Sequence, residues 1–386
     1  MGAVSRIGGL LVSGLALAAP ARAAEDAPPP TPPAVERPLA DETGALAQDA
    51  FDALVEETEA ARGLHFVRRP ELVLLEPDAP ERARLEADAK GLDPSVAGSA
   101  PPSKPAPGAP APAYVDVDAA RVYAAPPPAP VSIRMALARL IDAQNYPRLV
   151  ELAPRLRGDA GLAVRSLLAA SVSATSSNSW RRTPFEGPEL DLLGRPRIEG
   201  RVNGIPQFGG QTAWLVAAVF LAQRDDREEP FRKPPLSTKQ LLSPHAYTGS
   251  DRPVRLVGPP PLVSGCELTS DESLGVFAML AALSAVGGSA PGPALASWQG
   301  DRLLRFRCAD GAKPWIYVAE LARADEAPGF VAALDALLPS DLVRPLGTTR
   351  SGRRAAAWSG LPGAAVRDYA EGLEAAPVRE LEQLLP

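Results

Sequence analysis

Apolar positions recur with both helical and strand spacing along the chain. Spacings of three and four residues run over 46–61 and again from Ser132, where Ile133, Leu137 and Leu140 share one face. Further helices are predicted over 148–156, 159–180, 211–223, 271–286, 324–338 and 364–385. Strands are predicted over 66–75, 302–308, 315–321 and 353–358, with a short hairpin over 114–123. Because helices and strands do not alternate as βαβ units, the predicted fold class is α+β rather than α/β.

The N-terminus has the parts of a secretory signal. Arg6 supplies a positive charge, an apolar run covers 7–19, and Ala21 and Ala23 form a small-x-small pattern before a cleavage point. A membrane anchor is the weaker alternative, because the run is shorter than the roughly 20 residues of a spanning helix. No later stretch is long and apolar enough to cross a membrane either. We therefore predict a signal peptide over 1–23 and an exported protein, either periplasmic or extracellular.

Composition divides the rest of the chain. Residues 24–44 are rich in Pro and Ala and predict a flexible lead-in. The main domain is expected over 45–345, interrupted at 95–113 by a disordered loop of Pro, Ala, Gly and Ser. A C-terminal strand and helices over 346–386 are expected to pack on the same domain.

The charge and the cysteines narrow the class of partner and the compartment. The net charge is -6 without a block of one sign, which gives no reason to expect binding to nucleic acid or to an anionic membrane. Cys266 and Cys308 are the two cysteines. In an exported protein they favour a disulfide, which would stabilise the fold by about 4 kcal/mol, although two buried thiols are the alternative. Neither has a second Cys or a His nearby, so a cysteine-based metal site is not supported.

Five segments, in the same order, resemble those of a family of secreted bacterial HExxH zinc metallopeptidases of the gluzincin type. They are RGLHF at 62–66, YVD with RVY at 114–123, LIDAQNY at 140–146, PPLSTKQLLSPHAY at 234–247 and SWQGDR at 297–302. Together they cover roughly 45–340. The resemblance implies a zincin-like fold that is mostly helical with a small mixed sheet.

The residues that would bind zinc in that family are missing here. An HExxH helix places two His four residues apart, so that both reach one zinc ion, with a Glu beside the bound water. In the register set by 140–146, Met135 and Arg139 replace the two His and Ala136 replaces the Glu. The third ligand of the family, a Glu on a later helix, corresponds to Ala169. The resemblance therefore implies a degenerate member without the family's metal site.

Independently of that alignment, the chain has only two His, His65 and His245, which are too far apart in sequence to form such a pair. We predict no catalytic residue, no metal and no cofactor. Arg139 places a fixed positive charge where the metal would lie. We expect it either to pair with Asp142, one turn further on, or to point to solvent.

Three functions remain open after this step. The first is an exported, non-catalytic pseudopeptidase whose metal-free cleft binds a peptide or protein partner. The second is a hydrolase that uses other residues, such as His65 or His245. The third is a structural or assembly protein of the cell envelope, in which the Pro-rich segments serve as spacers.

Overall fold

The structure is a computed structural model of the chain. It describes residues 39, 47–75, 79, 113–124, 128–176, 198–202, 205–208, 210–249, 252–279, 295–337, 346–379 and 381, all within the unit Pro38–Pro386. The predicted signal peptide, nearly all of the lead-in and residues 95–112 of the predicted loop lie outside the described residues. The described elements are a mixture of helices and separate sheets, which confirms the α+β class.

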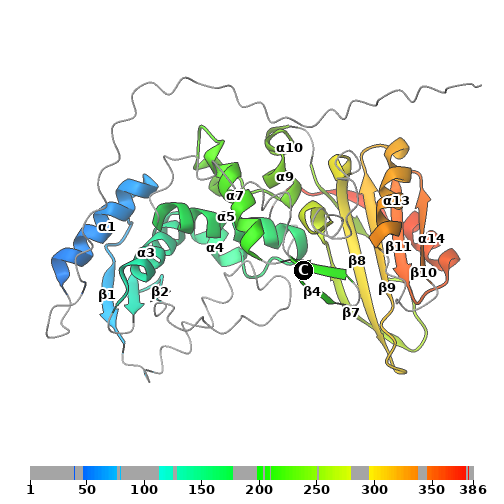
Figure 1. The fold of residues 1–386 in the computed structure, drawn as a ribbon, viewed down its shortest axis with the longest axis horizontal. Coiled ribbons are helices and arrows are strands. Elements are labelled where there is room, and N and C mark those ends of the chain that lie inside the picture. Colours follow the sequence, from blue (N-terminus) through cyan, green and yellow to red (C-terminus); the bar gives the residue numbers. More distant parts are fainter. Residues whose placement is uncertain are drawn as a thin grey trace, which may run out of the picture. The chain divides into compact units, whose positions relative to one another are not determined.

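Helices dominate the region before residue 250 (Figure 1). They are α1 (Gln48–Arg62), α3 (Pro130–Asn145), α4 (Pro147–Leu152), α5 (Gly158–Ser176), α7 (Gly210–Ala222), α8 (Glu229–Arg232), α9 (Thr238–Leu242) and α10 (Pro244–Thr248). Helix α5 packs against both α3 and α7. Apolar positions of α4, α5 and α7 close one core around Leu156, Leu167, Phe220 and Leu221. Helices α1 and α3 share a separate core that includes Phe51 and Leu137.

A three-stranded sheet accompanies the first helices. Strands β1 (Glu71–Leu74), β3 (Arg121–Ala124) and β2 (Ala113–Asp116) lie in that order, with β1 parallel and β2 antiparallel to β3. The expected hairpin over 114–123 is thus confirmed, and Ala113, which we placed in the Pro-rich loop, opens β2. A second hairpin pairs β4 (Ile198–Val202) with β5 (Ile205–Phe208).

The C-terminal part is built on a five-stranded antiparallel sheet in the order β10-β11-β9-β8-β7. Its elements are β7 (Cys266–Glu272), β8 (Trp298–Cys308), β9 (Trp315–Leu321), η2 (Ala324–Glu326), α13 (Ala327–Leu337), β10 (Leu346–Ser351), β11 (Arg354–Ser359) and α14 (Gly363–Gly372). Successive residues of a strand point to opposite faces. Tyr317 accordingly joins a core with Phe330 of α13, whereas Ile316 joins a core with Val366 of α14. The two helices therefore cover opposite faces of this sheet (Figure 1).

Cys266 and Cys308 face each other in register on β7 and β8 and form a disulfide. The disulfide prediction is confirmed, and the alternative of two free thiols is excluded. The bond ties β7, the last strand in the order of the described sheet, to its neighbour β8.

None of the helices in the described part of the chain combines the length and the apolar character that a membrane crossing needs.

Two predicted helix boundaries are wrong. Residues 271 and 272 end strand β7, and the helix predicted to begin there starts at residue 275. The helix predicted over 364–385 ends at Gly372, and β12 (Glu374–Pro377) follows it and pairs with β6 (Val254–Val257). In both cases pairing with a strand distant in sequence overrides the local pattern.

Candidate functional site

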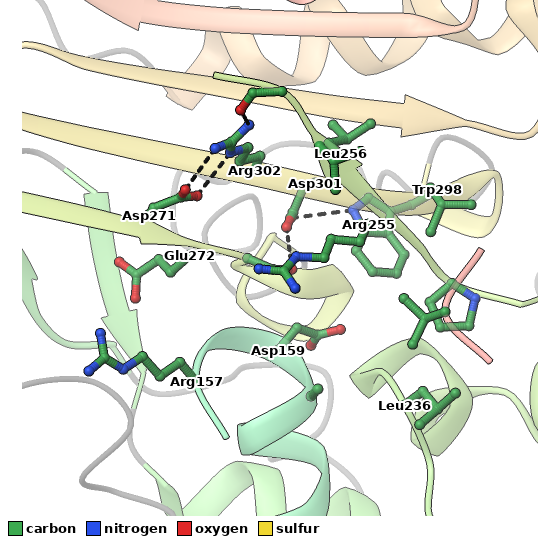
Figure 2. A pocket seen from close by; sticks show the side chains of 17 residues that line it. Arg157, Asp159, Leu236, Arg255, Leu256, Asp271, Glu272, Trp298, Asp301 and Arg302 are labelled. Carbon is green, nitrogen blue, oxygen red and sulfur yellow. Dashed lines mark hydrogen bonds and ion pairs between the residues drawn. The ribbon is translucent and has the colours of Figure 1, made fainter. Parts of the chain in front are cut away.

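One cavity lies between the start of α5 and the strands of the C-terminal part; we call it the β6 cavity. Its volume is about 360 Å³, within the range of roughly 300–1,000 Å³ that is typical of ligand pockets. Strand β6 lines it together with the end of β7, the first half of β8 and the start of α5 (Figure 2). The residues that line it include Arg157, Asp159, Leu236, Val257, Asp271, Glu272, Trp298, Asp301 and Arg302.

Asp301, a buried residue of β8, is saturated with hydrogen bonds. Its Oδ1 accepts from the Ser273 hydroxyl at 2.5 Å and from the Leu274 amide at 2.9 Å. Its Oδ2 accepts from the Gly275 amide at 2.9 Å, the Tyr317 hydroxyl at 3.1 Å and the Trp298 indole at 3.3 Å. Because a carboxylate offers about four lone-pair sites, these bonds leave it no site to use on a ligand. Asp301 also caps the helical turn that begins at residue 275.

Asp159, in the first turn of α5, is the second buried carboxyl group of the cavity. Both its oxygens accept from the Thr238 amide at 3.1 Å, and Oδ1 also accepts from the Thr238 hydroxyl at 2.5 Å. Gly275 packs directly against it: a Cβ built on this glycine would lie 1.8 Å from Asp159 Oδ1. Gly275 thus lies between the two carboxyl groups. Its amide donates a hydrogen bond to Asp301, and its Cα packs against Asp159. We define Asp159, Asp301 and Thr238 as the Asp159 cluster.

Burial raises the pKa of both carboxyl groups. For Asp159, removal from water raises the pKa to about 8, against the lowering effect of the Thr238 hydroxyl bond and with a further increase from the charge of Asp301. Burial likewise raises the pKa of Asp301, although four of its five donors oppose that shift. At neutral pH Asp159 is therefore mostly protonated, and the inner wall of the cavity carries less negative charge than its composition suggests.

The outer part of the β6 cavity has ordered charges beside apolar walls. Arg302 forms a bidentate ion pair with Asp271, at 2.9 Å from Nε to Oδ1 and 2.7 Å from Nη2 to Oδ2. Its Nη1 donates to the Gly258 carbonyl at 2.8 Å, which attaches the end of β6 to β8. Glu272 is paired with Arg305, and Arg157 is exposed at the edge of the cavity.

A second group of buried charges lies in the helical part; we call Arg62, Asp142 and Glu228 the Arg62 cluster. Arg62 Nε donates to Asp142 Oδ1 at 2.8 Å, and its two terminal nitrogens donate to the Glu228 carboxylate. The Tyr146 hydroxyl also donates to Glu228. Asp142 is therefore ion-paired with Arg62, and its pairing with Arg139 stays a prediction.

The four degenerate positions do not line the β6 cavity. Met135 is 38% exposed on α3, Ala136 is fully buried there, and Arg139 and Ala169 are half-buried on α3 and α5. The two helices pack against one another, but a cleft at these positions stays a prediction. His65 and His245, the residues of the hydrolase alternative, are both exposed and lie outside the cavity.

Within the described residues, no three His, Cys, Asp or Glu side chains gather as a metal-binding group.

Four of the five segments that carry the family resemblance meet in two pairs inside the protein. Arg62, from 62–66, bonds Asp142, from 140–146. Thr238 and Lys239, from 234–247, bond Asp159 and the Trp298 carbonyl; the distance from Lys239 Nζ to that oxygen is 2.7 Å. These motifs therefore belong to two buried polar clusters that hold the framework together. Sequence reasoning found the segments but not this role, because the partners are far apart along the chain.

Comparison with known proteins adds no relative: no protein-family model, curated protein or solved structure matches the chain.

Proposed function

We propose that this chain is an exported, non-catalytic binding protein with a peptidase-like framework, and that its β6 cavity binds a segment of a peptide or protein partner. The observation that carries the proposal is the saturation of Asp301 by five internal hydrogen bonds, while Thr238 engages both oxygens of Asp159. A general acid or base must be able to reach a proton of the substrate. Here the carboxyl oxygens are already used by the protein, so the cavity offers a fixed binding surface.

The walls of the β6 cavity suit a peptide. Leu236 and Val257 supply apolar surface, whereas the Asp271–Arg302 pair supplies polar groups at the edge. An extended peptide carries apolar side chains and amide groups in alternation, and it can satisfy both kinds of wall at once. Export is supported by the disulfide, because such bonds persist in oxidising compartments.

A cavity-filling variant tests the proposal. Purified protein starting at Ala24 is mixed with a tryptic casein digest, and the peptides that co-elute in gel filtration are identified by mass spectrometry. Val257→Phe should reduce retention by about tenfold or more because the larger ring occupies the cavity. Val67→Phe is the matched control, since Val67 is 70% exposed and lies outside the cavity.

Two results would overturn the proposal. One is equal retention by wild type and Val257→Phe. The other is cleavage of the casein peptides by the wild-type protein, above all cleavage that EDTA abolishes and zinc restores.

One observation favours a second candidate, a hydrolase. Two buried carboxyl groups whose pKa values are raised, one to about 8, lie in one cavity, and such pairs occur at acid–base catalytic sites. If Asp159 were a catalytic acid, casein peptides would be cleaved and Asp159→Asn would abolish the cleavage. Under the binding proposal, neither protein cleaves them.

A further inference from the structure

A second cavity, which we call the α4 cavity, has a volume of about 750 Å³ and a different chemistry. It is lined by the start of α4, by the segment from α8 to Leu236, by the end of α10 and by Arg252 and Arg379. Leu236 is the residue that it shares with the β6 cavity.

Positive charge is concentrated around this cavity. Five basic residues line it against one acidic residue, Glu229, although the whole chain has a net charge of -6. The basic residues are Arg148, Arg232, Lys233, Arg252 and Arg379. Such a local excess in an acidic protein creates a positive potential that attracts anionic ligands.

Part of this charge is not neutralised within the described part of the chain. Glu229, the acidic residue of the lining, is paired with Arg224; the distance from Arg224 Nη2 to Glu229 Oε2 is 3.5 Å. The negative charge of Glu229 is therefore already compensated. Arg232 is paired with Asp226. Lys233 and Arg252 are exposed, and among the described residues neither side chain has an acidic partner. Within the described part of the chain, these two cations are therefore open to a ligand.

The inner wall of the α4 cavity is aromatic and firmly held. The rings of Tyr146 and Phe231 stack with their centroids 5.1 Å apart. The Arg62 guanidinium lies 4.5 Å from the Phe231 centroid, and the Tyr146 hydroxyl is bonded to Glu228. The Tyr247 hydroxyl donates to the Lys233 carbonyl at 2.7 Å, which fixes the backbone beside the Lys233 cation. An aromatic wall beside separate cations fits a ligand with several anionic groups on an apolar body.

We propose that the α4 cavity binds an acidic peptide segment, whose carboxylates pair with Lys233 and Arg252 and whose apolar side chains rest on the half-buried ring of Tyr146. Inorganic phosphate shares the anionic chemistry but has no apolar part, so it uses only half of the site. This inference rests on the proposed function in that it names the charge of the partner, but it assigns a cavity separate from the β6 cavity.

Charge reversal with a matched control tests this inference. The probe is a fluorescein-labelled peptide of alternating Glu and Leu, and fluorescence anisotropy measures its binding to the chain starting at Ala24. Lys233→Glu with Arg252→Glu should weaken binding by at least about tenfold, because like charges then face the ligand. Arg307→Glu with Arg367→Glu makes the same change in net charge at exposed positions outside both cavities. This control should change the affinity by less than about threefold.

Two further probes of the wild-type protein keep the test decisive even if a variant folds poorly. A peptide of alternating Gln and Leu should bind at least about tenfold more weakly than the acidic peptide. Inorganic phosphate at millimolar concentration should not displace the acidic peptide.

Several results would overturn the inference: equal binding of the Gln peptide, equal losses in the two double variants, or displacement by phosphate. Val257→Phe separates this inference from the proposed function. If that variant alone abolishes binding of the acidic peptide, the peptide does not bind in the α4 cavity, and the proposed function stands. If the Lys233 and Arg252 double variant alone abolishes binding of both the acidic and the casein peptides, the β6 cavity is not the peptide-binding site.

Discussion

The Arg62 cluster and the Asp159 cluster each contain two carboxyl groups, all buried except the part-exposed Glu228, but they compensate the charge in different ways. In the Arg62 cluster, a guanidinium with almost no exposed surface lies between Asp142 and Glu228. In the Asp159 cluster, the hydrogen-bond donors to the two carboxyl groups are hydroxyl, amide and indole groups without charge. The first therefore depends on opposite charge and the second on neutral donors.

This difference determines where protons are held. Burial alone would lower the pKa of Arg62, but the charges of Asp142 and Glu228 outweigh it, and the net shift is upward. The guanidinium therefore stays charged at any accessible pH. Neutral donors offset less of the cost of burying a charge, and the pKa of Asp159 rises to about 8 as burial favours its protonated form. The Asp159 cluster is thus the one whose stability responds to pH near neutrality.

Removal of the cation from the Arg62 cluster should have the largest effect on stability. Arg62→Met leaves Asp142 and Glu228 facing each other without compensation, and we expect a loss of about 3–5 kcal/mol in the free energy of unfolding. Urea denaturation followed by circular dichroism measures it. Arg367→Met, on the exposed face of α14, is the control and should change stability by less than about 0.5 kcal/mol. A loss under about 1 kcal/mol at Arg62 would show that the cluster is open to water.

Crowding at the Asp159 cluster should have the next largest effect. Gly275 and Gly63 both have positive φ angles, +79° and +74°, so an alanine is strained at either position. At Gly63 a Cβ meets nothing within 4 Å, whereas at Gly275 it would collide with Asp159. Gly63→Ala should therefore cost about 1–2 kcal/mol, and Gly275→Ala about 2 kcal/mol more. Equal losses in urea denaturation would mean that Asp159 moves aside freely.

A smaller effect should appear when stability is followed against pH. The unfolded Asp159 carboxyl releases its proton near pH 4 and the folded one near pH 8. Between these values the folded state binds more protons, so the free energy of unfolding falls as pH rises. Asp159→Asn should flatten this decline, which is on the order of a few kcal/mol.

Thermal unfolding from pH 5 to pH 9 checks this expectation, with Asp368→Asn on the exposed face of α14 as the control. Asp301, the other carboxyl group of the cluster, contributes in the same direction, because its pKa is also raised. A profile of equal slope in wild type and Asp159→Asn would assign the decline to other groups.

The local sequence patterns correctly predicted two kinds of element: helices with one apolar face, and strands that are buried along their whole length. The apolar face of α3 and the apolar run of β9, which is buried along its whole length, are unambiguous. The last two residues of β7 and the whole of β12 fall inside predicted helices. Strand β7 is mostly exposed and ends in acidic residues, and β12 exists through its pairing with β6, more than a hundred residues earlier. No local pattern contains that partner.

The cavities were less predictable than the fold. The residues that line the β6 cavity are spread along the sequence from Arg157 to Val378. No sequence motif near one of them indicates that the others lie beside it. Asp159 follows a glycine at the start of a helix, and the sequence gives no sign that Thr238 and Gly275 enclose it. Asp301 lies in the SWQGDR segment, which we singled out for its resemblance. That segment was therefore a usable signal, but for a buried framework cluster and not for a zinc site.

The smallest expected effect concerns the charge balance of the Arg62 cluster, which has two carboxylates for one guanidinium. In Glu228→Gln, the amide oxygen can still accept from Arg62, and the amide nitrogen can donate to the Tyr146 hydroxyl. The variant leaves Arg62 paired with Asp142 alone and the cluster neutral, and the Glu228 side chain is 23% exposed. We therefore expect a loss of less than about 1 kcal/mol in urea denaturation, against about 3–5 kcal/mol for Arg62→Met. If Glu228→Gln proved as destabilising as Arg62→Met, both carboxylates would be needed to hold the guanidinium, and the Arg62 cluster would depend on its hydrogen-bond geometry more than on opposite charge.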